Sequence, residues 1–453
     1  MVAIGEVADP VVRSEAPMPG VTYRQVGVRL WGEGAYERES IDGAETKYKT
    51  LSRVEAGDII VNKIWARNGS VSVVTRSLEG CLCSGEFPLF RPRLERLDPQ
   101  WFYWITKTRW FWEACDRQSR GTSGKNRLRP QRFLEIPIPL APIEEQRRVV
   151  EKLNRLATGL SRVNRLSSLA EREQDLLLAA TYRAVFRGER PYAVKPSGLD
   201  AWATLVAQAL KYANARRSKH NRAHPDSPKR IEGADALPDE WVWTTLGSVL
   251  THLVDCVNDT PDFAPHDTGF FGLKTTNVRP FRLVLNERWY MTQEDFGRWN
   301  RREAPRPGDI LLTREAPVGN ACMLPTGVTA CLTQRLMLLR TDPECVSPEY
   351  VLHFLNSPQF QEQVQEASRG ATTPHVNVKD APGFAIPFAP REEQDAIVRY
   401  LNRARGRLET VGHLRCRALS EARSLLASAL GASFVSETED SPALLREDGH
   451  GSP

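Results

Sequence analysis

The chain has 453 residues, which is too long for one compact domain and indicates two to four units at roughly 100–200 residues each. Its composition, 41% hydrophobic and 26% charged, excludes a chain that is disordered throughout, and the net charge of +5 permits an anionic partner without requiring one. No run of 18 apolar residues occurs and the first residues lack the layout of a signal peptide, so we expect a cytoplasmic protein with no membrane span.

Changes in composition along the chain divide it into six segments. In order they are a mixed α/β domain over 1–140, a long helix over 141–187, a helix with an exposed linker over 188–236, a second α/β domain over 237–388, a second long helix over 389–435, and a tail over 436–453 that is expected to be disordered.

Within the two domains, short β-rich runs alternate with Gly, Pro and Asp turns, which is typical of strands. Strands are predicted at 59–61, 71–74, 87–90 and 310–312, and helices at 101–112, 199–217 and 349–364.

The chain repeats itself. The phrase Ile138–Gln146 returns as Ile386–Gln394, and other matches keep the same order along the chain. They are Ile4–Val7 with Leu246–Val249, Gly57–Ile60 with Gly308–Leu311, Asp98–Trp101 with Ser347–Tyr350, and Ser119–Gly121 with Ser368–Gly370. Since chance does not order matches in this way, the chain is a tandem duplication of a unit about 200 residues long.

Each copy ends in a long helix that begins at a proline, Pro142 or Pro390, followed by a pair of glutamates in the first turn. Apolar residues then recur at the 4-3-4-3 spacing of a two-helix coiled coil. They are Val149, Leu153, Leu156, Leu160 and Val163 in the first helix and Ile397, Leu401, Ala404, Leu408 and Val411 in the second. We expect the helices to pair along this stripe over about 65 Å. The alternative is that each stripe packs on its own domain.

The Pro-x-x-Glu-Gln phrase that opens both long helices, together with Leu237-Pro-Asp-Glu-Trp241 at the start of the second domain, resembles the specificity subunits of type I restriction-modification systems. The first copy begins at Ile4 without the Leu-Pro-x-x-Trp lead. The resemblance covers the chain to about residue 435. It implies two α/β (α+β) target recognition domains in pseudo-symmetric tandem, linked by a long antiparallel two-helix coiled-coil spacer.

In that family each target recognition domain reads one half of a bipartite site in double-stranded DNA. The spacer docks the methyltransferase subunits, of which two are expected, and the restriction subunits. S-adenosylmethionine, ATP and Mg²⁺ are implied for these partners, whereas this chain is expected to be non-catalytic and to bind no cofactor or metal. The residues predicted for subunit docking and helix pairing are Glu145, Gln146, Val149, Leu153, Leu156, Leu160, Glu393, Gln394, Ile397, Leu401 and Leu408.

Positive charge gathers in the first domain. Residues 91–132 contain eleven Lys and Arg against four Asp and Glu, interleaved with aromatic residues whose helical spacing indicates core packing. Cations neutralise phosphates and Arg reads guanine edges, so basic and small polar residues of both domains are the predicted DNA contacts. They are Lys63, Arg67, Ser119, Arg120, Thr122, Ser123, Lys125 and Arg127 in the first domain and Lys274, Arg314, Arg335, Arg369, Thr372 and Thr373 in the second.

Among these, Lys63 and Arg314 follow the matched Gly-Asp-hydrophobic strands and are expected at equivalent strand ends. Arg314 is the better candidate for a guanine contact, although a surface ion pair accounts for either residue equally well.

Catalytic signatures are missing from the sequence. It has no Asn/Asp-Pro-Pro-aromatic motif, no hydrolase or zincin motif, and eight cysteines without zinc spacing, which are expected to be reduced and mostly buried. Two alternatives stay open: the specificity component of another methylation or phage-defence system built on the same domain, and a coiled-coil scaffold that does not bind DNA. A stand-alone enzyme is a further rival, which activity of the isolated chain would reveal.

Overall fold

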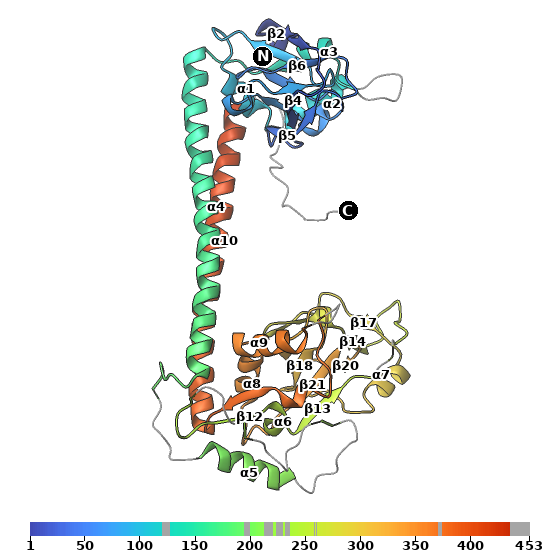
Figure 1. Ribbon diagram of the computed structural model, residues 1–453, viewed down its shortest axis with the longest axis vertical. Helices are drawn as coiled ribbons and strands as arrows, with labels where there is room; N and C mark the ends of the chain where they lie inside the picture. The colour runs from blue at the N-terminus through green and yellow to red at the C-terminus, as the bar shows by residue number, and fades with distance from the viewer. Residues whose placement is uncertain are drawn as a thin grey trace. The chain divides into compact units, whose positions relative to one another are not determined.

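The computed structural model describes residues 1–119, 127–193, 200–212, 221–222, 230–231, 236–257, 259, 261–369 and 374–434 (Figure 1). Contacts divide the chain into two units, Met1–Ser168 with Leu414–Pro453 and Leu169–His413. Each unit combines one α/β domain with part of each of two long helices, α4 (Ile143–Phe186) and α10 (Arg391–Phe434). None of the helices in this described part of the chain has the length and apolar character needed to cross a bilayer.

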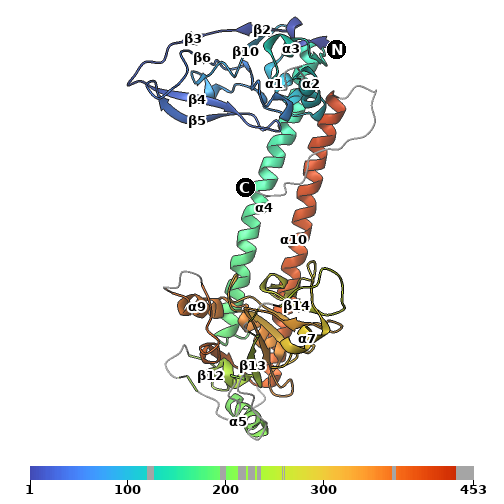
Figure 2. The same ribbon diagram turned by 90° about the vertical axis from the view of Figure 1, so that its right-hand side faces the viewer.

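The first domain contains a four-stranded antiparallel sheet, β2-β10-β7-β8, and a five-stranded mixed sheet, β3-β6-β9-β4-β5 (Figure 2). The strands are β2 (Ala8–Val11), β3 (Ser14–Glu15), β4 (Thr22–Val28), β5 (Ala35–Asp42), β6 (Leu51–Arg53), β7 (Ile59–Val61), β8 (Val71–Val73), β9 (Leu82–Cys83) and β10 (Leu89–Pro92). The helices are α1 (Pro99–Ile105), α2 (Arg109–Ser119) and α3 (Pro130–Leu134), with short 3-10 helices η1 (Ile4–Glu6), η2 (Ala66–Asn68) and η3 (Arg76–Leu78). Strand β7 is fully buried, as its β-branched run predicts.

The second domain contains a four-stranded antiparallel sheet, β13-β21-β18-β19, a three-stranded sheet, β17-β14-β20, and the hairpin β15-β16. The strands are β13 (His252–Asp255), β14 (Phe271–Leu273), β15 (Val278–Arg279), β16 (Arg282–Leu283), β17 (Trp289–Tyr290), β18 (Ile310–Thr313), β19 (Ala321–Met323), β20 (Cys331–Leu332) and β21 (Leu336–Arg340). The helices are α5 (Ala201–Tyr212), α6 (Leu246–Val249), α7 (Gln293–Trp299), α8 (Pro348–Leu355) and α9 (Pro358–Ala367), with η4 (Thr275–Asn277) and η5 (Ala381–Gly383).

The duplication extends to the strand pairing. The four-stranded sheets of the two domains correspond strand by strand, and a separate pair closes each domain: β1 (Val2–Ala3) with β11 (Pro137–Ile138), and β12 (Val242–Thr245) with β22 (Ala385–Phe388). The first copy lacks the Leu-Pro-x-x-Trp lead, and its opening strand is two residues long where the second copy has four. The tandem α/β architecture predicted from the sequence is therefore the observed one.

Two predicted helices are each broken into two. Residues 101–112 belong to α1 and α2, because the hydroxyls of Thr106 and Thr108 donate to the carbonyls of Tyr103 and Ile105, both at 2.7 Å, and satisfy the end of α1. Residues 349–364 belong to α8 and α9, which meet at Ser357 because the residue before a proline avoids helical geometry.

The apolar stripes of the long helices begin in the cores of their own domains. Leu153 is fully buried in the first core, and Ile397 and Leu401 are fully buried in the second. Farther along, Leu156, Leu160 and Leu408 are half-buried, and Val411 is exposed. Over the first turns of each long helix, the stripe thus packs on its own domain. Farther along the helix, the stripe residues are less buried.

Part of the predicted linker is attached to the second domain. The side chain of Asn221 donates to the Thr251 carbonyl at 2.9 Å and accepts from the Leu253 amide at 2.9 Å, and the guanidinium of Arg230 lies 4.7 Å from the centre of the Trp202 ring. Most of the basic stretch and the whole of the tail 436–453 lie outside the described residues.

Candidate nucleic-acid interface

A buried glutamine joins each domain to the start of its long helix. Gln146 accepts a hydrogen bond from the Asp98 amide (2.9 Å) and donates to the carbonyls of Arg96 (2.8 Å) and Ala141 (2.7 Å). Its counterpart Gln394 accepts from Ser347 (2.8 Å) and donates to Ala389 (2.8 Å). The repeated Pro-x-x-Glu-Gln phrase therefore orients each long helix on its domain.

This burial corrects the expectation that Gln146 and Gln394 offer a surface to another subunit. Neither glutamine has any exposed surface, and their amides are committed to main-chain groups of the domain. Leu153, Ile397 and Leu401 are equally inaccessible to a second protein. Of the residues predicted for docking, Glu145 is exposed, and Val149, Leu156, Leu160 and Leu408 are half-buried.

A second repeated contact lies about two turns farther along each long helix. The indole of Trp104 donates to the amide oxygen of Asn154 at 3.0 Å, and the ring of His353 bonds to Asn402 at 3.0 Å. His353 also bonds to the Tyr182 hydroxyl at 2.7 Å. Burial and the nearby Arg405 lower the pKa of His353 to about 4, so the ring is neutral in the folded protein.

Each domain also holds the far end of the other copy's helix. Phe434, the last residue of α10, packs edge-on against Trp101 with ring centres 4.6 Å apart. Phe186, the last residue of α4, packs against Tyr350 at 5.6 Å. Within each unit the start of one long helix therefore packs beside the end of the other, which makes the two segments antiparallel.

The two copies differ at the second glutamate of the phrase. Glu393 is buried and receives hydrogen bonds from Arg190 (2.7 Å), Tyr192 (3.1 Å) and the indole of Trp241 (2.8 Å). Glu145 occupies the same place in the first copy and is exposed. The Leu-Pro-x-x-Trp lead thus supplies the indole that covers Glu393, and the first copy, which lacks that lead, leaves Glu145 uncovered.

Lys63 and Arg314 lie at equivalent strand ends, as the sequence predicts. The Lys63 amide donates to the Glu86 carbonyl at 3.1 Å, and the Arg314 amide donates to the Arg335 carbonyl at 2.8 Å. A segment farther along the chain also bonds to each site, because the Leu128 amide donates to the Lys63 carbonyl at 2.8 Å and the Val376 amide donates to the Arg314 carbonyl at 2.9 Å. The main-chain framework is therefore the same at both places.

The charges on this framework differ between the domains. In the first, Lys63 and Arg127 both lie near the carboxylate of Glu86, at 3.7 and 3.2 Å. In the second, an arginine, Arg335, stands where Glu86 stands in the first, with Glu315 3.4 Å from its guanidinium. The two sites thus place two cations and one carboxylate differently on one backbone, which is a physical basis for recognising different base sequences.

Several predicted DNA contacts have other neighbours in the structure. Ser119 is corrected to a structural role, because its side chain is buried and its hydroxyl donates to the Cys115 carbonyl at 2.7 Å, one turn back in α2. Arg369 is exposed and pairs with Glu366 at 2.9 Å. Arg67 is half-buried in η2. The residues Arg120, Thr122, Ser123, Lys125, Thr372 and Thr373 lie outside the described residues.

The ammonium group of Lys274 packs against two aromatic rings. Its ammonium group lies 3.1 Å from the centre of the Trp289 ring and 4.3 Å from that of Phe263. Burial lowers its pKa from the ordinary lysine value, which is the expected effect of desolvating an ammonium group. The side chain is thus already engaged within its own domain.

One surface feature was not predicted from the sequence. The turn between β4 and β5 carries Trp31, which is 55% exposed, and Trp65 just before η2 is 45% exposed. The sequence signal for this turn is a further repeat, because Val28-Arg29-x-Trp31 returns as Val278-Arg279-x-Phe281. The match is too short to be recognised by sequence alone.

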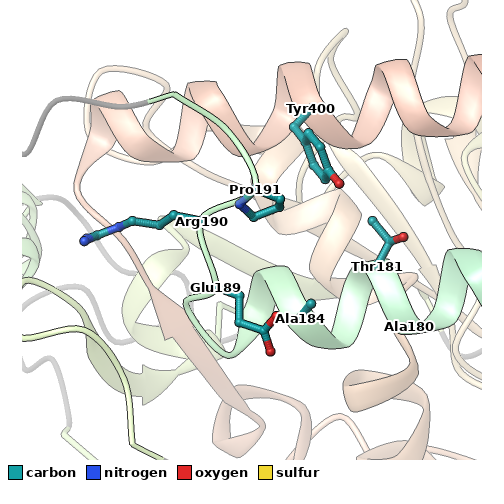
Figure 3. Close-up of a pocket in the computed structure, with 7 residues that line it drawn as sticks. All are labelled: Ala180, Thr181, Ala184, Glu189, Arg190, Pro191 and Tyr400. Atoms are coloured by element: carbon teal, nitrogen blue, oxygen red, sulfur yellow. The ribbon is translucent and has the colours of Figure 1, made fainter.

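A pocket lies beside the long helices in the described part of the second unit. A cavity of about 510 Å³ in the second unit is lined by α4, α10 and the turn after α4, and its lining, shown in Figure 3, is mostly small or apolar. The lining residues are Ala180, Thr181, Ala184, Glu189, Arg190, Pro191 and Tyr400. Within the same described residues, no group of three or more His, Cys, Asp or Glu could hold a metal ion.

Comparison with known proteins agrees with this arrangement. No protein-family model matches the chain. It is similar to the specificity subunits of the Escherichia coli type I restriction enzymes EcoBI, at 19% identity over 66% of this chain, and EcoEI, at 21% over 83%. The matches span 58% of the EcoBI subunit, less than two thirds of its length, and 70% of the EcoEI subunit.

Solved structures share the fold. One, from a type I restriction-modification system described for its complex assembly and conformational transition, has a TM-score of 0.64 at 19% identity and covers 95% of this chain and 96% of its own. The HsdS subunit from Thermoanaerobacter tengcongensis has a TM-score of 0.57 at 21% identity, covering 96% of this chain and 95% of its own. The chain is thus similar to type I specificity subunits in sequence and in fold.

Proposed function

We propose that this chain is the sequence-specific DNA-binding subunit of a type I restriction-modification complex. Its two α/β domains act as target recognition domains, each reading one half of a bipartite duplex site. The chain itself is non-catalytic. Partner methyltransferase subunits would supply S-adenosylmethionine-dependent methylation of adenine, and a restriction subunit would use ATP and Mg²⁺.

The repeated framework is the observation that carries this proposal. Gln146 and Gln394 fasten the two domains to their helices in the same way, while Glu86 and Arg335 give equivalent loops different charges. Two domains that share a backbone framework and differ in their loop side chains can recognise two different half-sites. The reason is that base recognition depends on the loop side chains and not on the framework.

We further propose that α4 and α10 act as a coiled-coil spacer that docks two methyltransferase subunits. Leu166 and Leu177 are exposed on α4, and Leu414 and Leu425, 248 residues later, are exposed on α10. Eleven residues make about three helical turns, so each pair lies on one face of its helix. Two matching apolar faces fit two copies of one partner.

Sequencing the methylated bases of cells with and without this gene tests the function. The expected result is loss of one bipartite adenine-methylation motif when the gene is removed. An unchanged methylation pattern at a locus whose methyltransferase is expressed and active would overturn the proposal.

The docking surface needs a separate test. Aspartate at Leu166 and Leu177 is expected to reduce the bound methyltransferase subunits from two to one, and aspartate at Leu414 and Leu425 as well is expected to remove both, measured as complex mass by light scattering. Leu94→Asp, at an exposed leucine of the first domain, is the matched control. Two bound subunits in every variant would refute this docking surface.

Salt dependence separates the proposal from a scaffold that does not bind DNA. Association of the assembled complex with duplex DNA is expected to weaken steeply as salt rises, because phosphate contacts release counterions. A scaffold would show no such binding. A specificity component of another methylation system would bind in the same way, and the neighbouring genes would distinguish it.

A further inference from the structure

The turn between β4 and β5 presents a strained aromatic residue to solvent. Trp31 has a φ of +57°, in the left-handed region that a bulky side chain rarely occupies. Its ring is nevertheless 55% exposed. This backbone conformation is unfavourable by itself and persists only where neighbouring groups stabilise it. The contacts around the turn provide that stabilisation.

Three hydrogen bonds hold the turn in place. The Trp31 amide donates to the Asn68 carbonyl at 2.6 Å, and the Gly32 amide donates to that of Gly69 at 3.1 Å. On the other side, the Lys107 ammonium group donates to the Gly32 carbonyl at 2.7 Å. A Cβ atom at Gly32 would lie 2.9 Å from the Thr106 carbonyl oxygen, so the turn fits closely against the end of α1.

The indole is supported along one edge. Trp31 and Trp112 meet edge to face, with ring centres 5.7 Å apart. This contact fixes the direction of the indole and leaves more than half of its surface open. A rigid backbone and a supported ring together make a preorganised contact surface, which loses little conformational entropy on binding.

The second domain has a shorter turn, between β15 and β16, whose aromatic residue is covered. Phe281 also has a positive φ, +61°, and its ring packs against the Arg405 guanidinium of α10 at 3.6 Å and against His353 at 5.1 Å. The position corresponding to Arg405 in the first copy is Ala157, which has no guanidinium to cover Trp31. A positive φ at the aromatic residue is thus common to both turns, and exposure of that residue is particular to the first.

Two arginines lie on the segments that form and hold the turn. Trp65 is exposed at the start of η2, whose last residue, Asn68, bonds to Trp31. Arg67 lies within η2, and Arg29 opens the turn with its guanidinium 4.9 Å from the centre of the Tyr36 ring. Exposed aromatic rings near cations suit a nucleic acid, whose bases can pack on the rings and whose phosphates can pair with the cations. They suit an apolar protein surface less well.

We propose that Trp31 is a DNA-contacting residue of the first domain, whose indole packs against the bases of the half-site that this domain reads. The contact is apolar, either stacking on a base or covering a thymine methyl group, and Arg29 and Arg67 neutralise the adjacent phosphates. This inference rests on the proposed function, because it assigns a side chain to the DNA site of that function.

The test uses the complex assembled with its methyltransferase partner and labelled duplexes that carry the methylated motif. Trp31→Ala is expected to weaken specific affinity by roughly tenfold or more, the order expected for one lost aromatic contact. It is also expected to reduce the penalty for base changes in the first domain's half-site and to leave the penalty in the other half unchanged. The salt slope should not change, because indole carries no charge.

Three further variants separate contact from folding. Trp31→Gly removes the same ring and relieves the positive φ, so it is expected to match Trp31→Ala in binding while the domain stays folded by circular dichroism. Trp31→Phe should restore most of the affinity. Tyr48→Ala removes another exposed aromatic ring of the first domain and is expected to leave binding unchanged.

Two results would overturn the inference. One is unchanged half-site discrimination in the folded Trp31→Ala and Trp31→Gly complexes while the wild type binds its motif. The other is loss of methyltransferase assembly in these variants, which would make the indole a protein contact. If the wild-type complex itself showed no preference for the motif, the proposed function would fail first, and the two failures are therefore distinguishable.

Discussion

Replacing Gln146 with alanine is expected to loosen the first domain from α4 without changing any exposed residue. The glutamine makes three hydrogen bonds to main-chain groups and has no exposed surface. At roughly 1 kcal/mol net for each bond, the first unit should lose about 3 kcal/mol. Gln394 makes two such bonds, so the same change there should cost the second unit about 2 kcal/mol.

Hydrogen exchange measured by mass spectrometry can follow the two units separately. A loss of about 3 kcal/mol corresponds to roughly a hundredfold faster exchange of amides that open with the unit. We expect the increase for Gln146→Ala in peptides from α1 and the first turns of α4, including the Asp98 amide that loses its acceptor. Peptides from the second domain should exchange as in the wild type.

The control is the neighbouring Glu145→Ala, which changes an exposed side chain of the same helical turn and should cost less than about 0.5 kcal/mol. If Gln146→Ala accelerates exchange in the first unit no more than Glu145→Ala does, the buried glutamine does not hold the domain on its helix. Equal acceleration in both units would also contradict the reasoning, because these hydrogen bonds belong to one unit only.

Three other predictions concern single side chains. Alanine at Phe434 or Phe186 should destabilise the first or the second unit, respectively, by about 3–5 kcal/mol, measured by hydrogen exchange in that unit, because each ring is buried in that domain's core. Because the pKa of His353 is lower in the folded protein than in the unfolded chain, the unfolded chain takes up a proton at a higher pH. The free energy of unfolding of the second unit should therefore fall by about 3 kcal/mol as the pH falls from about 6.5 to 4. His353→Gln should flatten this part of the pH–stability curve, measured by urea denaturation. Arg314→Ala should lower specific DNA affinity by roughly tenfold while the domain stays folded. Unchanged binding would mean that the arginine side chain has only a structural role, through its hydrogen bond to the Val376 carbonyl.

The duplication and the starts of the long helices were predictable from the sequence because they depend on local signals. Proline with acidic residues in the first turn marks where α4 and α10 begin, and the observed starts, Ile143 and Arg391, follow Pro142 and Pro390 directly. The role of the glutamine in the same phrase was not predictable. A polar residue in the first turn of an amphipathic helix is normally solvated, and the burial of Gln146 depends on Arg96 and Asp98, some 50 residues earlier in the chain.

The candidate site residues likewise divide into those that a local sequence pattern predicts and those whose environment depends on distant contacts. The equivalence of Lys63 and Arg314 could be predicted because both follow a matched strand, and strands carry a local pattern. The exposure of Trp31 could not be predicted, because the ring of its counterpart Phe281 is covered by Arg405 of a distant helix, and the first copy has alanine at the position corresponding to Arg405. An aromatic residue beside a glycine is usually taken for core, and a positive φ is not visible in the sequence.

At the sites that follow β7 and β18, the two copies differ in side chains that the shared main-chain framework does not use. The hydrogen bonds of Gln146 and Gln394 end on main-chain groups, which any sequence supplies, so the loops can change without loosening the helices. At the loops, Glu86 in the first copy is replaced by Arg335 in the second, and each site combines two cations with one carboxylate in a different arrangement. A base edge whose donors and acceptors fit one arrangement would be less favoured at the other. A framework that tolerates opposite charges at equivalent positions can carry two independent half-site preferences, and the two halves of the recognised site should therefore differ in sequence.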